Sequence, residues 1–107
     1  MQSPTRAGLN MDRASDTALR LIDKLLAERP ERVGHDFSEA TRWVAAYRDE
    51  LIADWRRTGM EADRQRLAAV NGVLSVVLAG HYPLGAIPWP QLEKARTALA
   101  EVSSATV

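Results

Sequence analysis

The feature that most constrains the fold of this chain is a run of fourteen uncharged residues, 67–80, with the sequence LAAVNGVLSVVLAG. Elsewhere the chain is rich in charge, since charged residues make up 26% of the whole. At the helical step of about 100° per residue, the large apolar side chains of the run fall on one side of a helix. The small ones fall in a narrow stripe on the opposite side, which consists of Ala68, Gly72, Ser75 and Ala79.

A helix that is apolar or small all round has to be covered on every side. The run therefore predicts one of two environments, the centre of a single domain or one half of an interface between subunits. Glycine inside a helix costs about 1 kcal/mol of helix propensity relative to alanine, so Gly72 indicates close packing. On this basis Gly72→Leu is expected to destabilise the fold by overpacking or to prevent dimerisation.

Hydrophobic periodicity indicates four amphipathic helices, at about 15–29, 37–57, 60–79 and 90–102. Pro30 ends the first, because the residue before a proline is pushed out of helical geometry. Gly59 and Gly80 stand where glycine commonly ends a helix, and Pro90 stands at a favoured first position. No segment shows the sustained alternation of a β-strand. The chain is predicted to be all-α, a compact antiparallel four-helix bundle with a Pro/Gly-rich loop at 80–89.

Two capping boxes are predicted at helix starts. Asp36 with Glu39 would begin the second helix, and Thr58 with Glu61 would begin the third. In such a box each side chain bonds the backbone N–H of the other residue. Because the second box directly follows the end of the second helix, we expect the second and third helices to form a tight antiparallel hairpin.

The second helix carries most of the aromatic side chains on one face, which is typical of core packing. These aromatic residues are Phe37, Trp43, Tyr47 and Trp55. Arg48 falls on the same apolar side. A charge in that position has to extend to the surface, stack on an indole or find an acid, so Arg48 is either a snorkelling residue at the edge of the core or half of an ion pair across an interface.

A chain of 107 residues supports one domain, expected at 13–103, with 1–12 as a disordered leader and 104–107 as a frayed tail. The absence of cysteine excludes disulfides and a thiol nucleophile. The N-terminus lacks the apolar region of a signal peptide, and the uncharged run is too short to span a bilayer, so we expect a cytoplasmic protein.

Catalytic motifs are missing from the sequence. No serine lies in a G-x-S-x-G elbow, and no glycine-rich turn has the pattern of a phosphate-binding loop. Glu50 and Asp54 share a helix face, but no histidine follows a glutamate at the spacing of di-metal bundles, so a solvated acidic patch is the favoured interpretation. We expect no catalytic residue, no cofactor and no bound metal.

Basic residues are balanced by acidic ones, fourteen of each in the chain. Four arginines gather around the expected hairpin turn, where Asp54, Glu61 and Asp63 are interleaved with them; they are Arg56, Arg57, Arg64 and Arg66. A surface that neutralises itself is favoured over contact with phosphates. Nucleic-acid binding by this hairpin is kept as an alternative function.

The loop at 80–89 is the one non-helical stretch that combines aromatic residues, an imidazole and proline rigidity. Aromatic side chains on rigid loops are favoured contacts for partners. The predicted interaction surface therefore comprises His81, Tyr82, Leu84 and Trp89, together with Arg48. The competing interpretation is that Leu84, Ile87 and Trp89 fold back as a lid over the open end of the bundle.

Abundant packing surface and missing chemistry together favour a non-enzymatic interaction module, such as an accessory subunit, adaptor or small regulator. We expect it to form a homodimer and to bind a further protein, and not to bind membranes. The alternatives are a nucleic-acid-binding regulator and a small-ligand-binding protein or enzyme with its pocket beneath the loop 80–89.

Overall fold

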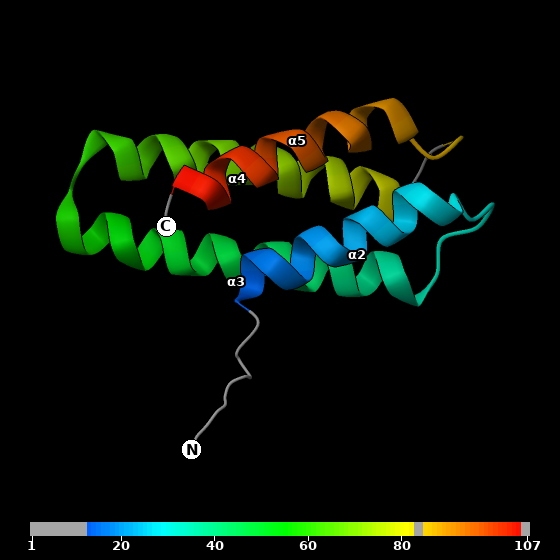
Figure 1. Cartoon of the computed structure of the whole chain (residues 1–107), viewed down its shortest axis with the longest axis horizontal. Helices are drawn as coiled ribbons and strands as arrows, with labels where there is room; N and C mark the ends of the chain where they lie inside the picture. Colours follow the sequence, from blue (N-terminus) through cyan, green and yellow to red (C-terminus); the bar gives the residue numbers. More distant parts are fainter. Residues whose placement is uncertain (1–12, 83–84, 106–107) are drawn as a thin grey trace, which may run out of the picture.

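The computed structural model of the chain describes residues 13–82 and 85–105. These contain four helices and no strand, which confirms the predicted all-α four-helix bundle (Figure 1); the helices are α2 (Ala14–Glu28), α3 (His35–Thr58), α4 (Glu61–His81) and α5 (Trp89–Ala105). The last helix continues three residues beyond its predicted end at 102, into the segment expected to fray. The predicted leader at 1–12 and Leu84 lie outside the described residues.

The helices pack in a closed cycle in which α2 contacts α3, α3 contacts α4, α4 contacts α5 and α5 contacts α2. A single apolar core fills the space between them, and its largest fully buried side chains are Phe37, Ile22, Leu25, Leu51, Leu92 and Leu99. The helix α4 therefore has two helical neighbours and a third side that faces outward. All four residues of the predicted small stripe are exposed on that side. The uncharged run is therefore not the centre of the domain, because the rest of the chain does not cover it on every side.

Neither predicted capping box is formed. The helix α3 begins at His35 with Gly34 as its N-cap, and no side chain caps it. Because the helix starts earlier than expected, Asp36 lies inside the first turn, where its carboxylate ion-pairs with Lys24 of α2 at 3.2 Å. The carboxylate still lies near the positive end of the helix dipole.

The turn between α3 and α4 is held by a different pair from the predicted one. Gly59 adopts the left-handed conformation with φ 64°, and its N–H donates to the carbonyl of Trp55 at 2.7 Å, which confirms its predicted role. The Thr58 hydroxyl donates to the carboxylate of Asp63, and it accepts from the N–H of Met60 at 3.2 Å. Asp63, and not Glu61, is therefore the partner of Thr58.

Gly80 does not end α4 as predicted, since the helix continues to His81. The reason for a glycine here is packing. A Cβ atom on residue 80 would lie 2.6 Å from Cε1 of Phe37, whose ring is fully buried. Gly80 therefore lets α3 approach α4 closely at this end of the bundle.

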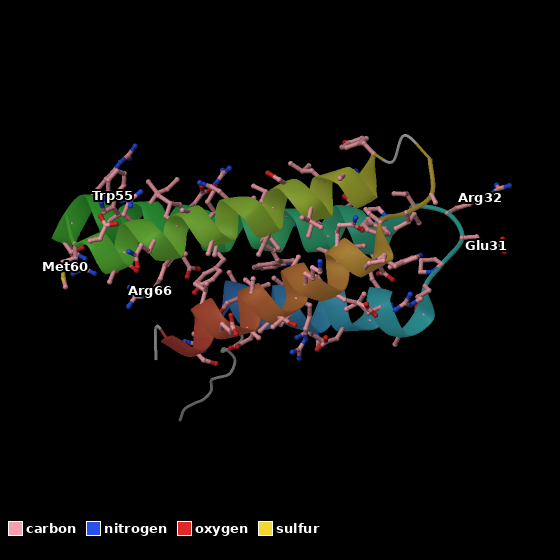
Figure 2. All side chains as sticks on the ribbon, turned by 90° about the horizontal axis from the view of Figure 1, so that it is seen from above. Glu31, Arg32, Trp55, Met60 and Arg66 are labelled. Atoms are coloured by element: carbon pink, nitrogen blue, oxygen red, sulfur yellow. The ribbon has the colours of Figure 1, made fainter. Side chains whose placement is uncertain are left out.

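The α3–α4 hairpin projects beyond the ends of α2 and α5 (Figure 1). Trp55 and Met60 lie on this projection (Figure 2) and are 38% and 57% exposed. The prediction that the whole aromatic face of α3 is core is therefore wrong for Trp55, although it is confirmed for Phe37 and Tyr47. The cause is the length of α3, which outruns the helices that could cover its last turns.

Candidate interaction surface

The predicted loop surface divides into an inward and an outward part. Trp89 is half-buried, its ring centroid 6.0 Å from that of Phe37, and the guanidinium of Arg29 lies 5.6 Å from its ring. Ile87 is also partly buried against the core. Ile87 and Trp89 therefore fold back over the end of the bundle, as the competing interpretation of the loop predicted for them.

Tyr82 is the outward part, with 69% of its surface exposed. Its ring meets the imidazole of His81 edge-on, with the ring centroids 4.2 Å apart. The Nδ1 atom of His81 is buried and has no hydrogen-bond partner among the described residues. The role of this pair as a contact for another protein stays a prediction.

Arg48 lies on α3 and does not join the loop residues. Its guanidinium pairs with the carboxylate of the adjacent Asp49 at 3.2 Å, and its Nε atom is buried without a hydrogen-bond partner in the described part of the chain. The side chain is thus half-buried, with its charged end near the surface, which is the arrangement expected of a residue at the edge of the core.

A surface that the sequence did not reveal runs between α4 and α5. One hollow in it has a volume of about 290 Å³ and is mostly apolar; its lining residues are Ala69, Gly72, Val73 and Val76 of α4 and Gln91, Lys94, Ala95 and Ala98 of α5. Small side chains from both helices leave this space open. Gly72 takes part in it, since a Cβ atom there would meet nothing within 4 Å.

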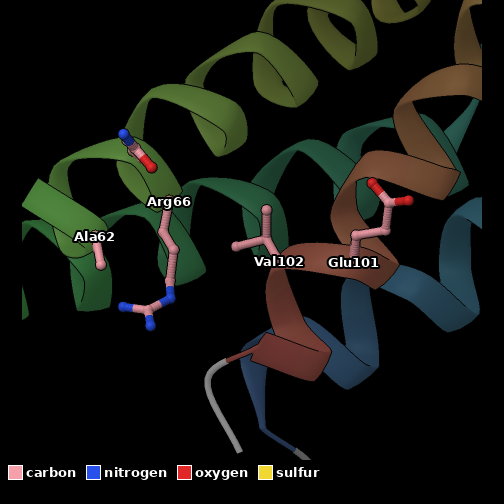
Figure 3. Close-up of a pocket in the computed structure, with 5 residues that line it drawn as sticks. Ala62, Arg66, Glu101 and Val102 are labelled. Carbon is pink, nitrogen blue, oxygen red and sulfur yellow. The ribbon is translucent and has the colours of Figure 1, made fainter.

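A second hollow continues the same seam toward the C-terminal end of α5 (Figure 3). Its volume is about 330 Å³, and its lining residues are Ala62, Gln65 and Arg66 of α4 and Glu101 and Val102 of α5. The two hollows are lined by successive turns of the same two helices. Together they form what we call the α4–α5 groove, which runs from Ala62 and Val102 to Val76 and Gln91.

Of the predicted small stripe, only Gly72 lines this groove. Glycine is unfavourable inside a helix, which is the signal in the sequence that points to this position. The α5 residues were missed because alanines and polar residues at spacings of three and four give no strong signal by themselves; they are Gln91, Lys94, Ala98 and Glu101. The remainder of the small stripe lies beside the groove, on the outward face of α4.

The two charged residues that α5 contributes to the groove have no ion-pair partner within residues 13–82 and 85–105. They are Lys94, which lines the first hollow, and Glu101, which lines the second. Their neighbours are paired. Arg66 binds Asp63 at 2.5 Å and Arg96 binds Asp23 at 2.7 Å. The groove thus carries one unpaired cation and one unpaired anion along its α5 edge.

The arginines around the hairpin turn are largely neutralised. Arg57 pairs with Asp54 at 3.1 Å, Arg64 with Glu61 at 2.5 Å, and Arg66 with Asp63. The hydrogen bonds from Arg64 lower the pKa of Glu61. A surface paired in this way presents little free positive charge to a phosphate backbone.

The acidic patch on α3 has no metal-binding geometry. Partial burial, and then the nearby charge of Asp54, raise the pKa of Glu50, while Arg13 lowers it. No three His, Asp or Glu side chains among the described residues stand close enough together to hold a metal ion. Glu50 and Asp54 are thus two interacting carboxylates on a helix surface.

The chain matches no protein-family model, and no significant match was found among the curated proteins or the solved structures with which it was compared. None of the described helices is both long and apolar enough to cross a membrane. The function is therefore inferred from the geometry of the surface, and in particular from the α4–α5 groove.

Proposed function

We propose that this protein is a non-enzymatic interaction module that binds an amphipathic helix in the α4–α5 groove. The groove itself is the observation that carries the proposal, because an apolar channel between two exposed helices is a common docking site for a third. Along α4 it extends over residues 62–76, which corresponds to about 21 Å at a rise of 1.5 Å per residue. That length fits about four turns of a helix.

The lining residues define the chemistry of the occupant. Ala69, Gly72 and Ala98 leave the middle of the groove open and apolar, so a helix with an apolar stripe could approach closely there. Lys94 and Glu101 would meet charges of opposite sign on either side of that stripe. Pairing these two side chains would give orientation and selectivity more than affinity.

The alternative functions have less support. A small-ligand site normally encloses most of its ligand, whereas both hollows are open along the seam. A nucleic-acid interface needs free cations, and three of the four arginines at the hairpin are paired with carboxylates.

Site-specific photocrosslinking in cells of the native organism tests the proposal. A photoreactive amino acid replaces Gln91, which lines the groove, and in a matched strain it replaces Ala27, which is exposed on α2 away from the groove. We expect discrete adducts from position 91 and none from position 27, with mass spectrometry identifying a partner peptide whose sequence has the periodicity of an amphipathic helix. Absence of adducts at position 91, or equal adducts at both positions, would overturn the proposal.

A further inference from the structure

The pattern of charge along the α4–α5 groove is complementary to itself. Lys94 and Glu101 are both exposed, both lack an ion-pair partner in the described chain, and lie on the same edge of α5. They are seven positions apart, which corresponds to about 10.5 Å along the helix. A surface that carries one cation and one anion at a fixed spacing can pair with a copy of itself turned end to end.

The antiparallel register of α4 and α5 places the centre of this pattern beside the small residues of the groove. One hollow combines Arg66 with Val102, and the other combines Val76 with Gln91. In this register Ala69 of α4 lies level with Ala98 of α5. The midpoint between Lys94 and Glu101 falls at residues 97–98, so the small residues lie midway between the two charges.

We propose that the groove is covered by the α4–α5 face of a second copy of this chain, which supplies the amphipathic helices of the proposed function; the inference rests on that function. A two-fold axis crosses the groove at the level of Ala69 and Ala98, so that each helix packs antiparallel to its own copy. Lys94 of one protomer then faces Glu101 of its partner, and the same pair forms again on the other side of the axis. Such an isologous contact is closed, as in most homodimers.

The same axis matches the residues of α4. Ala62 and Val76 lie equally far from Ala69 on either side, so an apolar side chain of one protomer faces an apolar side chain of its partner. Gly72 faces Arg66 in the same way. The missing side chain at residue 72 leaves room for the aliphatic stem of that arginine, which explains a glycine at an exposed position where the chain itself does not require one.

Charge reversal tests this register. Sedimentation equilibrium measures the dissociation constant of the wild type, Lys94→Glu, Glu101→Lys and the double variant that carries both. We expect the wild type to reach twice the 11.8 kDa chain mass at micromolar concentrations. Each single variant should raise the dissociation constant at least tenfold, because like charges then face each other. The double variant should return it to within about threefold of the wild type, because it restores both pairs with their signs exchanged.

Arg32→Glu is the matched control, because Arg32 is an exposed cation in the α2–α3 loop, at the end of the molecule opposite the hairpin projection (Figure 2). It should leave the dissociation constant unchanged. Thermal melts of all variants, measured below the dissociation constant of the wild type, should agree within a few degrees, since Lys94 and Glu101 make no ion pair within the described part of the chain.

Three results would overturn the inference. A monomeric mass at high micromolar concentration removes the second copy as the occupant. If neither single reversal raises the dissociation constant, the dimer forms through another face. If both raise it and the double variant does not restore it, the two copies pack in another register. If Gln91 meanwhile crosslinks to a different protein, the interaction module stands and only its occupant changes. If position 91 gives no adduct, the proposed function fails with it.

Discussion

At the scale of single residues, two glycines of α4 show how far local sequence can be read. Gly72 and Gly80 both lie inside the helix, where glycine is unfavourable, so both suggest a reason for the missing side chain. For Gly80 the reason is the ring of Phe37. For Gly72 the described chain supplies none. Whether a position needs glycine depends on the side chain of the neighbouring helix that packs against it. The sequence of α4 alone does not give that neighbour.

Alanine substitutions separate the two glycines. Gly80→Ala should destabilise the fold by about 1–3 kcal/mol, because the new Cβ overlaps a ring that is fully buried. Gly72→Ala should stabilise it by up to about 1 kcal/mol, through helix propensity alone. Urea unfolding measures both. A Gly80→Ala variant at least as stable as the wild type would mean that Phe37 moves aside.

Of the two outcomes expected from the sequence for Gly72→Leu, overpacking or loss of the dimer, the structure leaves the second. Overpacking within one chain is no longer expected, because nothing lies within 4 Å of a Cβ atom at this position. The substitution should instead weaken the dimer while the melting temperature measured at low concentration stays within a few degrees of that of Gly72→Ala. Sedimentation of the two variants makes the comparison. Equal dissociation constants would place Gly72 outside the dimer contact.

Glu50 predicts a dependence of stability on pH. Partial burial and then the charge of Asp54 raise its folded-state pKa above that of the unfolded chain. The folded state therefore holds this proton more tightly, and the wild type loses stability as the pH rises above about 4 and passes the folded-state pKa. Glu50→Gln removes the ionised form, so its gain over the wild type should be present at pH 7 and absent near pH 3.

Because Glu50 is largely exposed, that gain should stay within about 0.5 kcal/mol. Glu31→Gln is the control, since Glu31 is an exposed carboxylate in the α2–α3 loop with no ion pair inside the described residues. Chemical denaturation of the three proteins at both pH values gives the comparison. A Glu50→Gln gain that is as large at pH 3 as at pH 7 would assign the effect to packing and not to charge.

At the scale of the elements, the periodicity of apolar residues predicted all four helices, whereas the residues that start them were predicted less well. A helix body is specified by many positions that agree with each other. A cap depends on one or two residues, and a shift of the helix start by one or two positions changes the partners. At α4 the N-cap is Met60, which moves Asp63 into reach of Thr58 and leaves Glu61 to pair with Arg64.

This difference is testable by alanine substitution at both carboxylates. Asp63→Ala should destabilise the protein by about 1–3 kcal/mol, because Asp63 is nearly buried and accepts hydrogen bonds from both Thr58 and Arg66. Glu61→Ala should cost about 0.5 kcal/mol or less, since its pair with Arg64 is exposed. Both substitutions remove a negative charge from the first turn of α4, so the dipole effect is shared. Equal melting temperatures of the two variants would mean that Asp63 stabilises the start of α4 no more than Glu61 does.

The groove lies at the limit of what the sequence could predict. The small stripe on α4 predicted a surface suited to close packing, and Gly72 does line a groove. The partner helix α5 was predicted only as an amphipathic helix at about 90–102 that starts at Pro90. Lys94 and Glu101 acquire meaning only from the register between α4 and α5. Register is a tertiary property, which helical periodicity does not encode.

At the scale of the whole molecule, the cycle of helices has one seam unlike the others. The hairpin α3–α4 is joined by a tight turn and makes the most extensive contact, whereas α2 and α5, the first and last described helices, make the least extensive one. Ion pairs bridge this seam on the surface. Arg96 holds Asp23 through two bonds of 2.7 and 3.2 Å, and Arg29 binds Glu93 at 2.5 Å. All four side chains are substantially exposed, so these pairs contribute little free energy.

The bundle should therefore open along the α2–α5 seam before it unfolds as a whole. Closing this seam joins segments 64 and 73 residues apart, so its contacts carry the largest loop-closure cost in the fold. Native-state hydrogen exchange can be measured in increasing denaturant. The free energy of the opening that exposes the amides of α2 should be lower than that for the amides of α4 around Val70, Val73 and Val77. Asp23→Asn should lower the α2 opening energy and leave that of α4 unchanged. If α2 and α4 instead exchange with one energy at every denaturant concentration, the four helices form a single cooperative unit and the seam has no separate stability.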